Sequence, residues 1–241
     1  MKTITIMNRK GGTAKTTTCA SIGQCFARQG KRVLFIDLDD QKNLSTLLDP
    51  RPHDKGVVEL LEGTPLVECI TPTQWGDLVQ ASARLTLAHP TSKALRNALE
   101  GANYDVCMID CPPSLSSITL AGIIASDGLI IPVQADTFSL QGTKQLFSTL
   151  NAIEQQEGTH INVYGILLVR YQPRQTMAQQ ALTAFKKTAK AYGTRVFTAC
   201  IRESVTIREA QATKTDIYQY AKTGTIATDY RAVCAELLEE M

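Results

Sequence analysis

The chain has 241 residues, of which 44% are hydrophobic, and a formal net charge of +2 at pH 7. This length and composition favour a single large core, and the near-neutral charge excludes a strongly basic protein. No apolar run reaches the ~18 residues that a membrane span needs, and the start of the chain lacks the long apolar stretch of a signal peptide. The seven cysteines include no C-x-x-C pair. Scattered cysteines are typical of buried thiols in a reducing compartment, so we expect a cytoplasmic protein.

Strand and helix patterns alternate along the chain, which predicts an α/β fold: a mostly parallel central sheet with helices on both faces. Strands are predicted at residues 3–8, 32–38, 104–110, 128–134, 162–169 and 195–199. Helices are predicted at residues 15–29, 57–62, 92–100, 115–125, 138–157, 174–192, 204–212 and 225–240. The proline-containing segment 63–91 has the least regular pattern. We expect one domain over residues 1–241, with no separate N-terminal DNA-reading domain.

A candidate phosphate-binding loop follows the first predicted strand. A Gly-Gly turn that opens a helix points backbone N–H groups and the positive end of the helix dipole at an anion. Lys15 would then reach the β- and γ-phosphates, and the Thr16 hydroxyl would ligate Mg²⁺. The usual pattern G-x-x-x-x-G-K-[ST] is not met, because Arg9 and Ala14 stand at its two glycine positions. The predicted phosphate-binding residues are Lys10, Gly11, Gly12, Thr13, Ala14, Lys15, Thr16 and Thr17.

Carboxylates follow the second and third predicted strands. Asp37 and Asp39 end one apolar run and share one side of an extended chain, since side chains repeat every two residues. Asp110 ends the next apolar run, and Pro112 and Pro113 then block the strand. Ligands bind at the carboxyl ends of parallel strands. We therefore predict that Asp37 and Asp110 lie near the Mg²⁺ ion. A metal site at the flanking cysteines 107 and 111 is the less favoured alternative, because no second Cys or His pair is near them.

Basic residues are concentrated in one segment near the end of the chain. Between residues 170 and 222, ten Lys and Arg side chains stand against three acids. A clustered positive surface of this kind suits the phosphate backbone of DNA. The alternative is a set of solvated helix faces. The candidate DNA-binding residues are Lys186, Lys187, Lys190, Arg195, Arg202 and Arg208.

Together these motifs resemble the ParA/Soj-type partition ATPases of the MinD/ParA superfamily. The loop 10–17 is similar to their deviant Walker A motif, K-G-G-x-G-K-[ST]-T, and departs from it only at Ala14. Segment 37–41 resembles D-x-D-P-Q with Asp40 in place of the proline, and segment 110–114 matches D-x-P-P-[SG]. Residues 201–210 resemble a C-terminal block in which Arg202 takes a proline position and Glu203 an arginine position.

The resemblance implies an ATP hydrolase that uses ATP and Mg²⁺ and forms a homodimer when ATP is bound. It implies catalytic roles for Lys10, which would reach the partner's phosphates, for Lys15, and for Asp39, which would orient the attacking water. It also implies non-specific DNA binding on the nucleoid and a ParB-like or other cargo-bound adaptor that stimulates hydrolysis. The cargo would be a plasmid, a chromosome or a protein assembly.

Other functions remain as alternatives. A MinD-like membrane ATPase would need a basic amphipathic C-terminal helix, whereas residues 232–241 are acidic. A metabolic P-loop ligase of the same superfamily would normally use a conventional Walker glycine and carry a small-substrate pocket. An iron–sulfur electron carrier would need cysteine ligands from two subunits. A dinucleotide-binding module is disfavoured, because no G-x-G-x-x-G follows a strand.

Overall fold

Eight strands form one sheet in residues 1–240, the part of the chain that the computed structural model describes. The strands are β1 (Lys2–Ile6), β2 (Val33–Asp37), β3 (Ile70–Thr73), β4 (Gly76–Val79), β5 (Val106–Asp110), β6 (Gly128–Val133), β7 (Val163–Tyr171) and β8 (Ile201–Arg202). Their order is β3-β4-β2-β5-β1-β6-β7-β8, and every pairing is parallel except that of β3 with β4. The predicted α/β fold class is confirmed.

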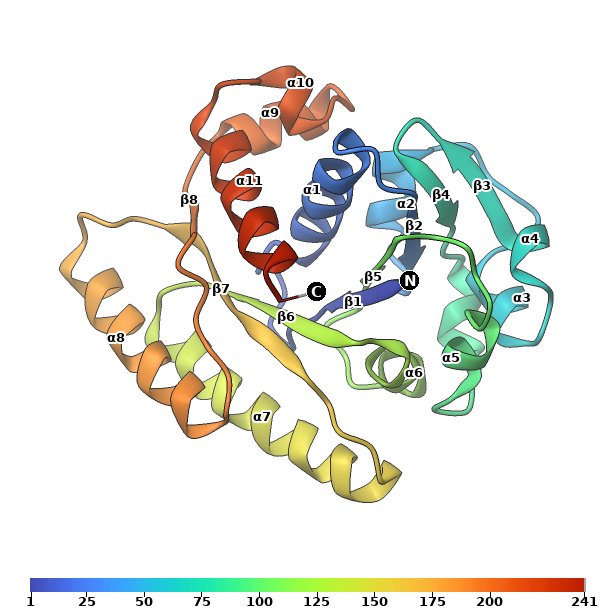
Figure 1. The fold of residues 1–241 in the computed structure, drawn as a ribbon, viewed down its shortest axis with the longest axis horizontal. Helices are drawn as coiled ribbons and strands as arrows, with labels where there is room; N and C mark the ends of the chain where they lie inside the picture. Colours follow the sequence, from blue (N-terminus) through green and yellow to red (C-terminus); the bar gives the residue numbers. More distant parts are fainter. Residues whose placement is uncertain (241) are drawn as a thin grey trace.

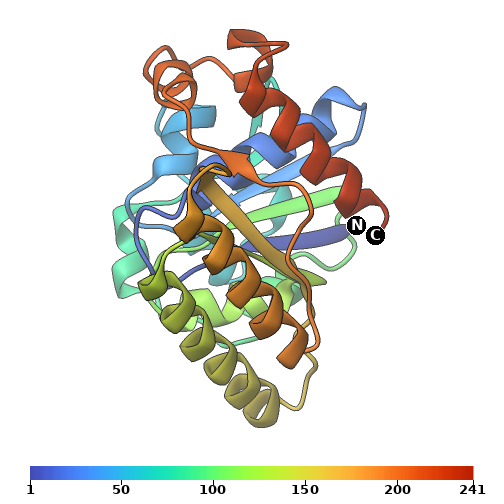
Figure 2. The same ribbon diagram turned by 90° about the vertical axis from the view of Figure 1, so that its left-hand side faces the viewer.

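Helices cover both faces of the sheet (Figures 1 and 2). One layer contains α1 (Lys15–Arg28), α2 (Asn43–Leu48), α9 (Thr206–Ala212), α10 (Ile217–Tyr220) and α11 (Thr225–Leu238). The other contains α3 (Val57–Leu61), α4 (Leu66–Cys69), α5 (Ala94–Ala98), α6 (Ser117–Ala125), α7 (Thr137–Glu157) and α8 (Thr176–Ala191). Since helices screen the central strands from water on both sides, β2 and β5 are buried along their whole length.

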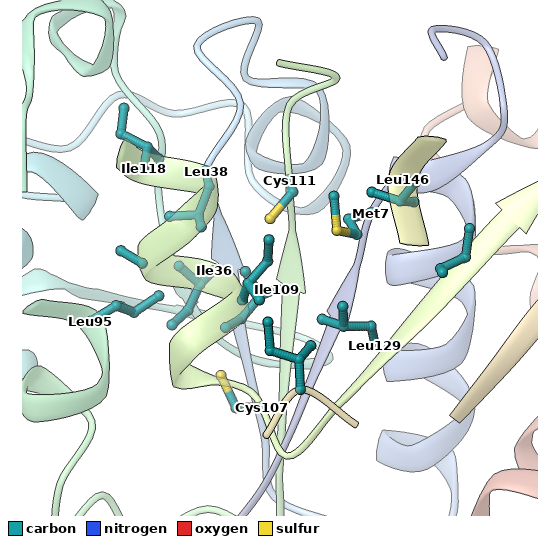
Figure 3. Close-up of a cluster of buried hydrophobic side chains, with 14 of the residues drawn as sticks. Met7, Ile36, Leu38, Leu95, Cys107, Ile109, Cys111, Ile118, Leu129 and Leu146 are labelled. Atoms are coloured by element: carbon teal, nitrogen blue, oxygen red, sulfur yellow. The ribbon is translucent and has the colours of Figure 1, made fainter. Parts of the chain in front are cut away.

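The buried side chains form two clusters, one on each face of the sheet. Figure 3 shows part of the cluster under α6, where Cys107 and Cys111 lie among aliphatic side chains such as Ile109 and Leu129. Both thiols are fully buried. Burial raises the pKa of each thiol, so they remain protonated at neutral pH. These two cysteines behave as small hydrophobic core residues.

The prediction of a strand at 195–199 is wrong. Only an isolated bridge joins Val196 to Ile166, and β8 begins at Ile201. The backbone N–H groups of Thr198 and of residue 199 donate to the Glu236 carboxylate of α11, at 3.0 Å for Thr198. These donors are therefore unavailable to a neighbouring strand.

The irregular segment 63–91 contains regular elements that the sequence pattern did not reveal. It forms α4, the antiparallel β3–β4 hairpin and a 3₁₀ helix at Ala83–Leu87. Strand β4 pairs in parallel with β2 and so extends the sheet. The two strands have four residues each, which is too short to produce a clear period-two pattern.

Candidate nucleotide site

The carboxyl ends of three central strands meet at one edge of the sheet. Ile6 of β1 and Asp37 of β2 both lie opposite Asp110 of β5 in the strand register. The phosphate loop follows β1 directly, so the loop and the two carboxylates occupy the same edge. In open α/β sheets this crevice is where ligands bind.

The phosphate loop turns sharply and then begins α1. Gly12 and Ala14 have positive φ angles of 72° and 57°, and Ala14 is the N-cap of the helix. The Thr13 hydroxyl donates to the Lys10 carbonyl at 3.2 Å, and the Lys15 ammonium donates to the same carbonyl at 3.4 Å. These bonds hold the loop in a curve whose backbone N–H groups can receive an anion.

Lys15 is only 8% exposed. Burial lowers the pKa of its ammonium, and the nearby carboxylates of Asp110 and Asp39 act in the opposite direction. A buried charge is costly unless it is paired, and a bound phosphate group would supply the negative partner for this ammonium.

Asp110 is fully buried, and within residues 1–240 neither of its carboxylate oxygens has a partner in hydrogen-bond geometry, although the neighbouring Thr16 hydroxyl acts to lower its pKa. Burial, followed by the charge of Asp37, raises its pKa well above the ordinary value. An unpartnered buried carboxylate is costly unless a cation binds it. Asp110 therefore fits the predicted Mg²⁺ site.

Asp37 is equally buried, but its oxygens are occupied. One oxygen accepts from the backbone N–H of Asp39 at 3.1 Å, and the other accepts from the Ser45 N–H and hydroxyl at 2.8 and 2.7 Å. Burial nevertheless raises the pKa of Asp37 to about 6. These contacts tie α2 to the end of β2, so Asp37 organises the chain that follows this strand.

Asp39 is 6% exposed and lines the cavity in front of the phosphate loop. One of its oxygens accepts from the Gln41 N–H at 3.0 Å, which fixes the carboxylate. Burial raises its pKa, and this shift makes the carboxylate a better proton acceptor.

A cavity of about 550 Å³ opens in front of the loop. Its lining includes the predicted residues Gly11, Gly12, Thr13, Ala14, Lys15, Thr16, Thr17 and Asp39. It also includes Gln41 and Pro113, which belong to the motifs but were not predicted as site residues. Five further lining residues lie outside the motifs: Asn43, Thr46, Leu47, Gln211 and Lys214. The predicted site residues Lys10, Asp37 and Asp110 do not line this cavity.

The Gln211 side chain of α9 donates to the Thr17 hydroxyl of α1 at 3.0 Å, which closes one end of the cavity. A much larger cavity of about 1060 Å³ lies at the amino ends of β2 and β4, beside Arg32 and Asp77. It is remote from the phosphate loop, so size alone does not locate the nucleotide site.

Known proteins are similar in sequence to this one over nearly the whole chain. The family model described as AAA domain matches residues 1–163. The chromosome-partitioning ATPase Soj of Thermus thermophilus is 36% identical over 245 residues, covering 99% of this chain and 96% of that protein. The chain belongs to the Soj/ParA family of P-loop ATPases. The family resemblance predicted from the motifs is therefore confirmed.

Solved structures agree with the fold described above. The ATP complex of Cyanothece McdA superimposes with a TM-score of 0.88 at 23% identity, covering 98% of this chain and 96% of that one, and so supports the fold. Cobyrinic acid a,c-diamide synthase from Mycobacterium smegmatis, with bound ADP and magnesium, gives a TM-score of 0.82 at 30% identity. It covers 100% of this chain and 95% of that one.

In this Soj/ParA-type chain the side chain of Lys10 contacts the start of α7. Its ammonium lies 3.1 Å from a carboxylate oxygen of Asp136 and 3.2 Å from the Ser139 hydroxyl. The Lys10 side chain is 42% exposed. Neither Asp136 nor Ser139 was among the predicted site residues, because 126 positions separate Lys10 from Asp136.

The six candidate DNA-binding residues divide into two groups. Lys186, Lys187 and Lys190 are exposed on α8, and Arg208 is exposed on α9. The other two, Arg195 and Arg202, are engaged in ion pairs. Arg195 contacts Glu236 and Glu240, and Arg202 contacts Asp229 of α11 through two guanidinium nitrogens. The latter two arginines therefore anchor α11 to the sheet.

Two further observations bear on the alternatives. The apolar side chains of α11 pack against α1, and Tyr230, Val233 and Leu237 have no exposed surface. This helix therefore presents no free apolar face of the kind an interfacial membrane helix needs. Among residues 1–240, no helix is long and apolar enough to cross a bilayer.

Proposed function

We propose that the chain is an ATP-dependent dimerising ATPase that binds DNA non-specifically and positions a plasmid, a chromosome or another cargo together with a cargo-bound adaptor. The observation that carries this proposal is Lys10, a partly exposed ammonium on the phosphate loop, beside the cavity that the rest of the loop lines. The partition role of the Thermus thermophilus relative supports the same proposal.

As a Soj/ParA-type ATPase, the protein hydrolyses ATP to ADP and phosphate, with Mg²⁺ as cofactor. The loop N–H groups and Lys15 bind the β- and γ-phosphates, and Asp39 orients and deprotonates the attacking water. Little covalent chemistry is required of the protein in phosphoryl transfer, so placement and charge stabilisation account for most of the catalysis.

Thr16 and Asp110 are the residues that would hold Mg²⁺, with Asp37 beside them. Within the described residues, no three His, Cys, Asp or Glu side chains converge in a way that could enclose a metal ion. At nucleotide sites Mg²⁺ is typically bound by one or two carboxylates together with substrate phosphates. When bound, Mg²⁺ neutralises charge that develops on the phosphate oxygens.

Lys10 would act on the ATP of the partner subunit. A cation supplied in trans neutralises transition-state charge, as an arginine finger does, and such groups are worth about 10³–10⁵ in rate. The γ-phosphate then becomes part of the dimer interface, and hydrolysis removes it. Apolar side chains are available near this edge for such an interface: Phe138 is 82% exposed and Met177 is 73% exposed. Both stand in the first turns of their helices, α7 and α8.

DNA binding would use the exposed lysines of α8. A dimer brings two such surfaces together, so individually weak phosphate contacts add and retention on DNA becomes dependent on ATP. The adaptor would stimulate hydrolysis and so release the protein from DNA as monomers.

The decisive test is the Lys10→Ala variant. Wild-type protein with a non-hydrolysable ATP analogue should sediment as a dimer, whereas Lys10→Ala should remain monomeric and still bind the analogue. Lys15→Ala is the matched variant, which should lose the analogue itself. A Lys10→Ala protein that dimerises normally would rule out the trans role.

The metabolic ligase is the second candidate, because a relative with that activity is 30% identical over the full chain. The two functions differ in what ATP binding controls. Retention on DNA that requires ATP supports the partition role. ATP turnover that requires a small carboxylic acid and an amine donor, with no DNA retention, would support the ligase.

A further inference from the structure

The phosphate loop is braced by the segment that follows β6. The Asn8 side chain donates to the Pro132 carbonyl at 2.6 Å, and the Gln134 side chain donates to the Gly12 carbonyl at 3.1 Å. The Lys10 backbone N–H is fixed in turn by the Asn8 side-chain oxygen at 3.1 Å. These neutral contacts hold the loop backbone and do not involve the Lys10 ammonium.

A charged contact joins the same two segments. The Lys10 ammonium binds Asp136, which is the N-cap of α7 and accepts from the Ser139 N–H at 2.7 Å and from its hydroxyl at 2.8 Å. The Ser139 hydroxyl lies 3.2 Å from the Lys10 ammonium. Partial burial raises the pKa of Asp136, but these hydrogen bonds and Lys10 outweigh that effect and the net pKa is lowered. Asp136 is therefore an ionised partner at neutral pH.

We infer that Asp136 is a positioning residue that holds Lys10 on its own subunit and thereby sets the protein concentration at which ATP-bound subunits dimerise. This inference rests on the proposed function, since it concerns how Lys10 becomes available to the partner. Asp136 and Ser139 occupy two of the three N–H donors of the ammonium, and both acceptors belong to the same subunit as Lys10. Extension of the Lys10 side chain into a second subunit takes the ammonium away from both of them. Every dimerisation event must therefore exchange the carboxylate for phosphate.

The free energy needed to separate Lys10 from Asp136 is small. The two side chains are 42% and 35% exposed. Ion pairs with this exposure shift an equilibrium by up to about fivefold. The triphosphate carries more charge than a carboxylate, so it can displace Asp136 when it is presented by a second subunit. The contact thus acts as a weak restraint that suppresses dimerisation at low protein concentration.

The Asp136→Asn variant tests the restraint. Asparagine is also a good N-cap, so α7 keeps its first hydrogen bond while the charge is removed. Both subunits of a dimer release one such contact, so the fivefold effect of each contact is squared. With the ATP analogue, half-maximal dimerisation should occur at up to about 25-fold lower protein concentration than in the wild type. The ATPase rate at saturating protein concentration should be unchanged, because Asp136 does not touch the nucleotide.

Asp105→Asn is the matched control. Asp105 pairs with Arg32 at 3.1 Å with similar exposure, at the amino end of β5 and so at the opposite edge of the sheet. It should leave the dimerisation threshold at the wild-type value. A threshold for Asp136→Asn equal to or above that of the wild type overturns the inference.

A second measurement separates this inference from the proposed function. In nucleotide-free monomer, acylation of Lys10 by an amine-reactive ester, mapped by mass spectrometry, should be several-fold faster in Asp136→Asn than in Asp105→Asn or the wild type. Equal rates show that Asp136 does not restrain Lys10, whether or not the protein dimerises. Failure of the wild type to dimerise, with faster labelling of Asp136→Asn, overturns the proposed function and leaves the contact between Lys10 and Asp136 intact.

Discussion

Ala14 occupies a backbone conformation that suits glycine. Its φ of 57° and ψ of 30° are left-handed, and its Cβ crowds the following carbonyl there at a cost of roughly 1–2 kcal/mol. The resembled motif has glycine at this position. The phosphate loop of this chain therefore carries local strain directly before Lys15.

Ala14→Gly should increase the stability of the nucleotide-free protein. Relief of strain exceeds the entropy that glycine adds to the unfolded chain, so the unfolding free energy should rise by roughly 0.5–1 kcal/mol. Urea denaturation measures the change. Ala27→Gly, in right-handed helix within α1, is the control and should lower stability by about the same amount. Equal effects of the two variants would show that Ala14 is not strained.

Asp110 and Asp37 make stability depend on pH. Their folded pKa values are raised, to about 6 for Asp37, so the folded state binds more protons than the unfolded chain between the ordinary carboxyl pKa and the raised values. Stability is therefore highest at low pH within this window and falls as the pH rises through it. For Asp37 the loss is up to roughly 3 kcal/mol.

Asp110→Asn tests this dependence. The unfolding free energy of nucleotide-free wild type should decline from pH 5 to pH 8, and the variant should decline less because one buried charge is absent. Urea denaturation across this pH range provides the slopes. Mg²⁺-dependent ATP hydrolysis should be lost in the variant. Parallel pH profiles for the two proteins would contradict the role given to Asp110.

At the scale of elements, a glycine in α1 allows this helix to pack closely against β2. A Cβ on Gly23 would lie 2.2 Å from a ring carbon of Phe35, and the Phe35 side chain is fully buried. The same Cβ would also lie 3.2 Å from Cγ of Met108, so both side chains would have to shift. Close approach of α1 to the sheet therefore depends on the absence of a side chain at this position, and α1 carries Lys15 and Thr16.

Gly23→Ala should destabilise the protein by about 1–3 kcal/mol through overpacking. Since α1 must shift, ATP affinity should fall as well. Gly142→Ala in α7 is the contrasting variant, because its Cβ would have nothing within 4 Å. It should stabilise the protein by about 0.5–1 kcal/mol, since alanine is the better helix former. Urea denaturation measures the unfolding free energy of both variants. A loss of stability at both positions would argue against specific crowding at Gly23.

At the scale of the whole molecule, some basic side chains form ion pairs within the protein and others are exposed on its surface. The Arg202 guanidinium pairs with Asp229, whose side chain is only 8% exposed, and so links β8 to α11. The lysines of α8 are exposed. A surface for DNA should therefore be built from α8 rather than from the engaged arginines.

The double variant Lys186→Glu, Lys187→Glu should weaken ATP-dependent DNA binding and flatten its salt dependence. Each lost phosphate contact lowers the slope of log affinity against log salt by about 0.9. Titration of DNA binding at several salt concentrations measures this slope. Arg202→Gln should instead lower stability and leave the slope unchanged. A double variant with the wild-type slope would assign these lysines to a solvated helix face.

Much of the site was determined by the sequence alone. The order of strand, Gly-Gly turn and helix predicts the phosphate loop, and apolar runs that end in Asp37 and Asp110 predict carboxylates at the same edge of a parallel sheet. These signals are local, because each lies within about ten residues of chain. Nearest-neighbour geometry and the burial pattern are enough to produce them.

Only the tertiary structure decided which partner each polar group has. In the folded chain Ser45 donates a hydrogen bond to Asp37, and Gln211 donates one to Thr17. Lys10 contacts Asp136 although 126 positions separate them in the sequence. The segment 195–199, predicted as a strand, forms only an isolated bridge, because N–H groups within it donate to Glu236 of a distant helix. Such pairings depend on how the helices pack on the sheet, and packing brings together residues whose separation in sequence carries no periodic signal.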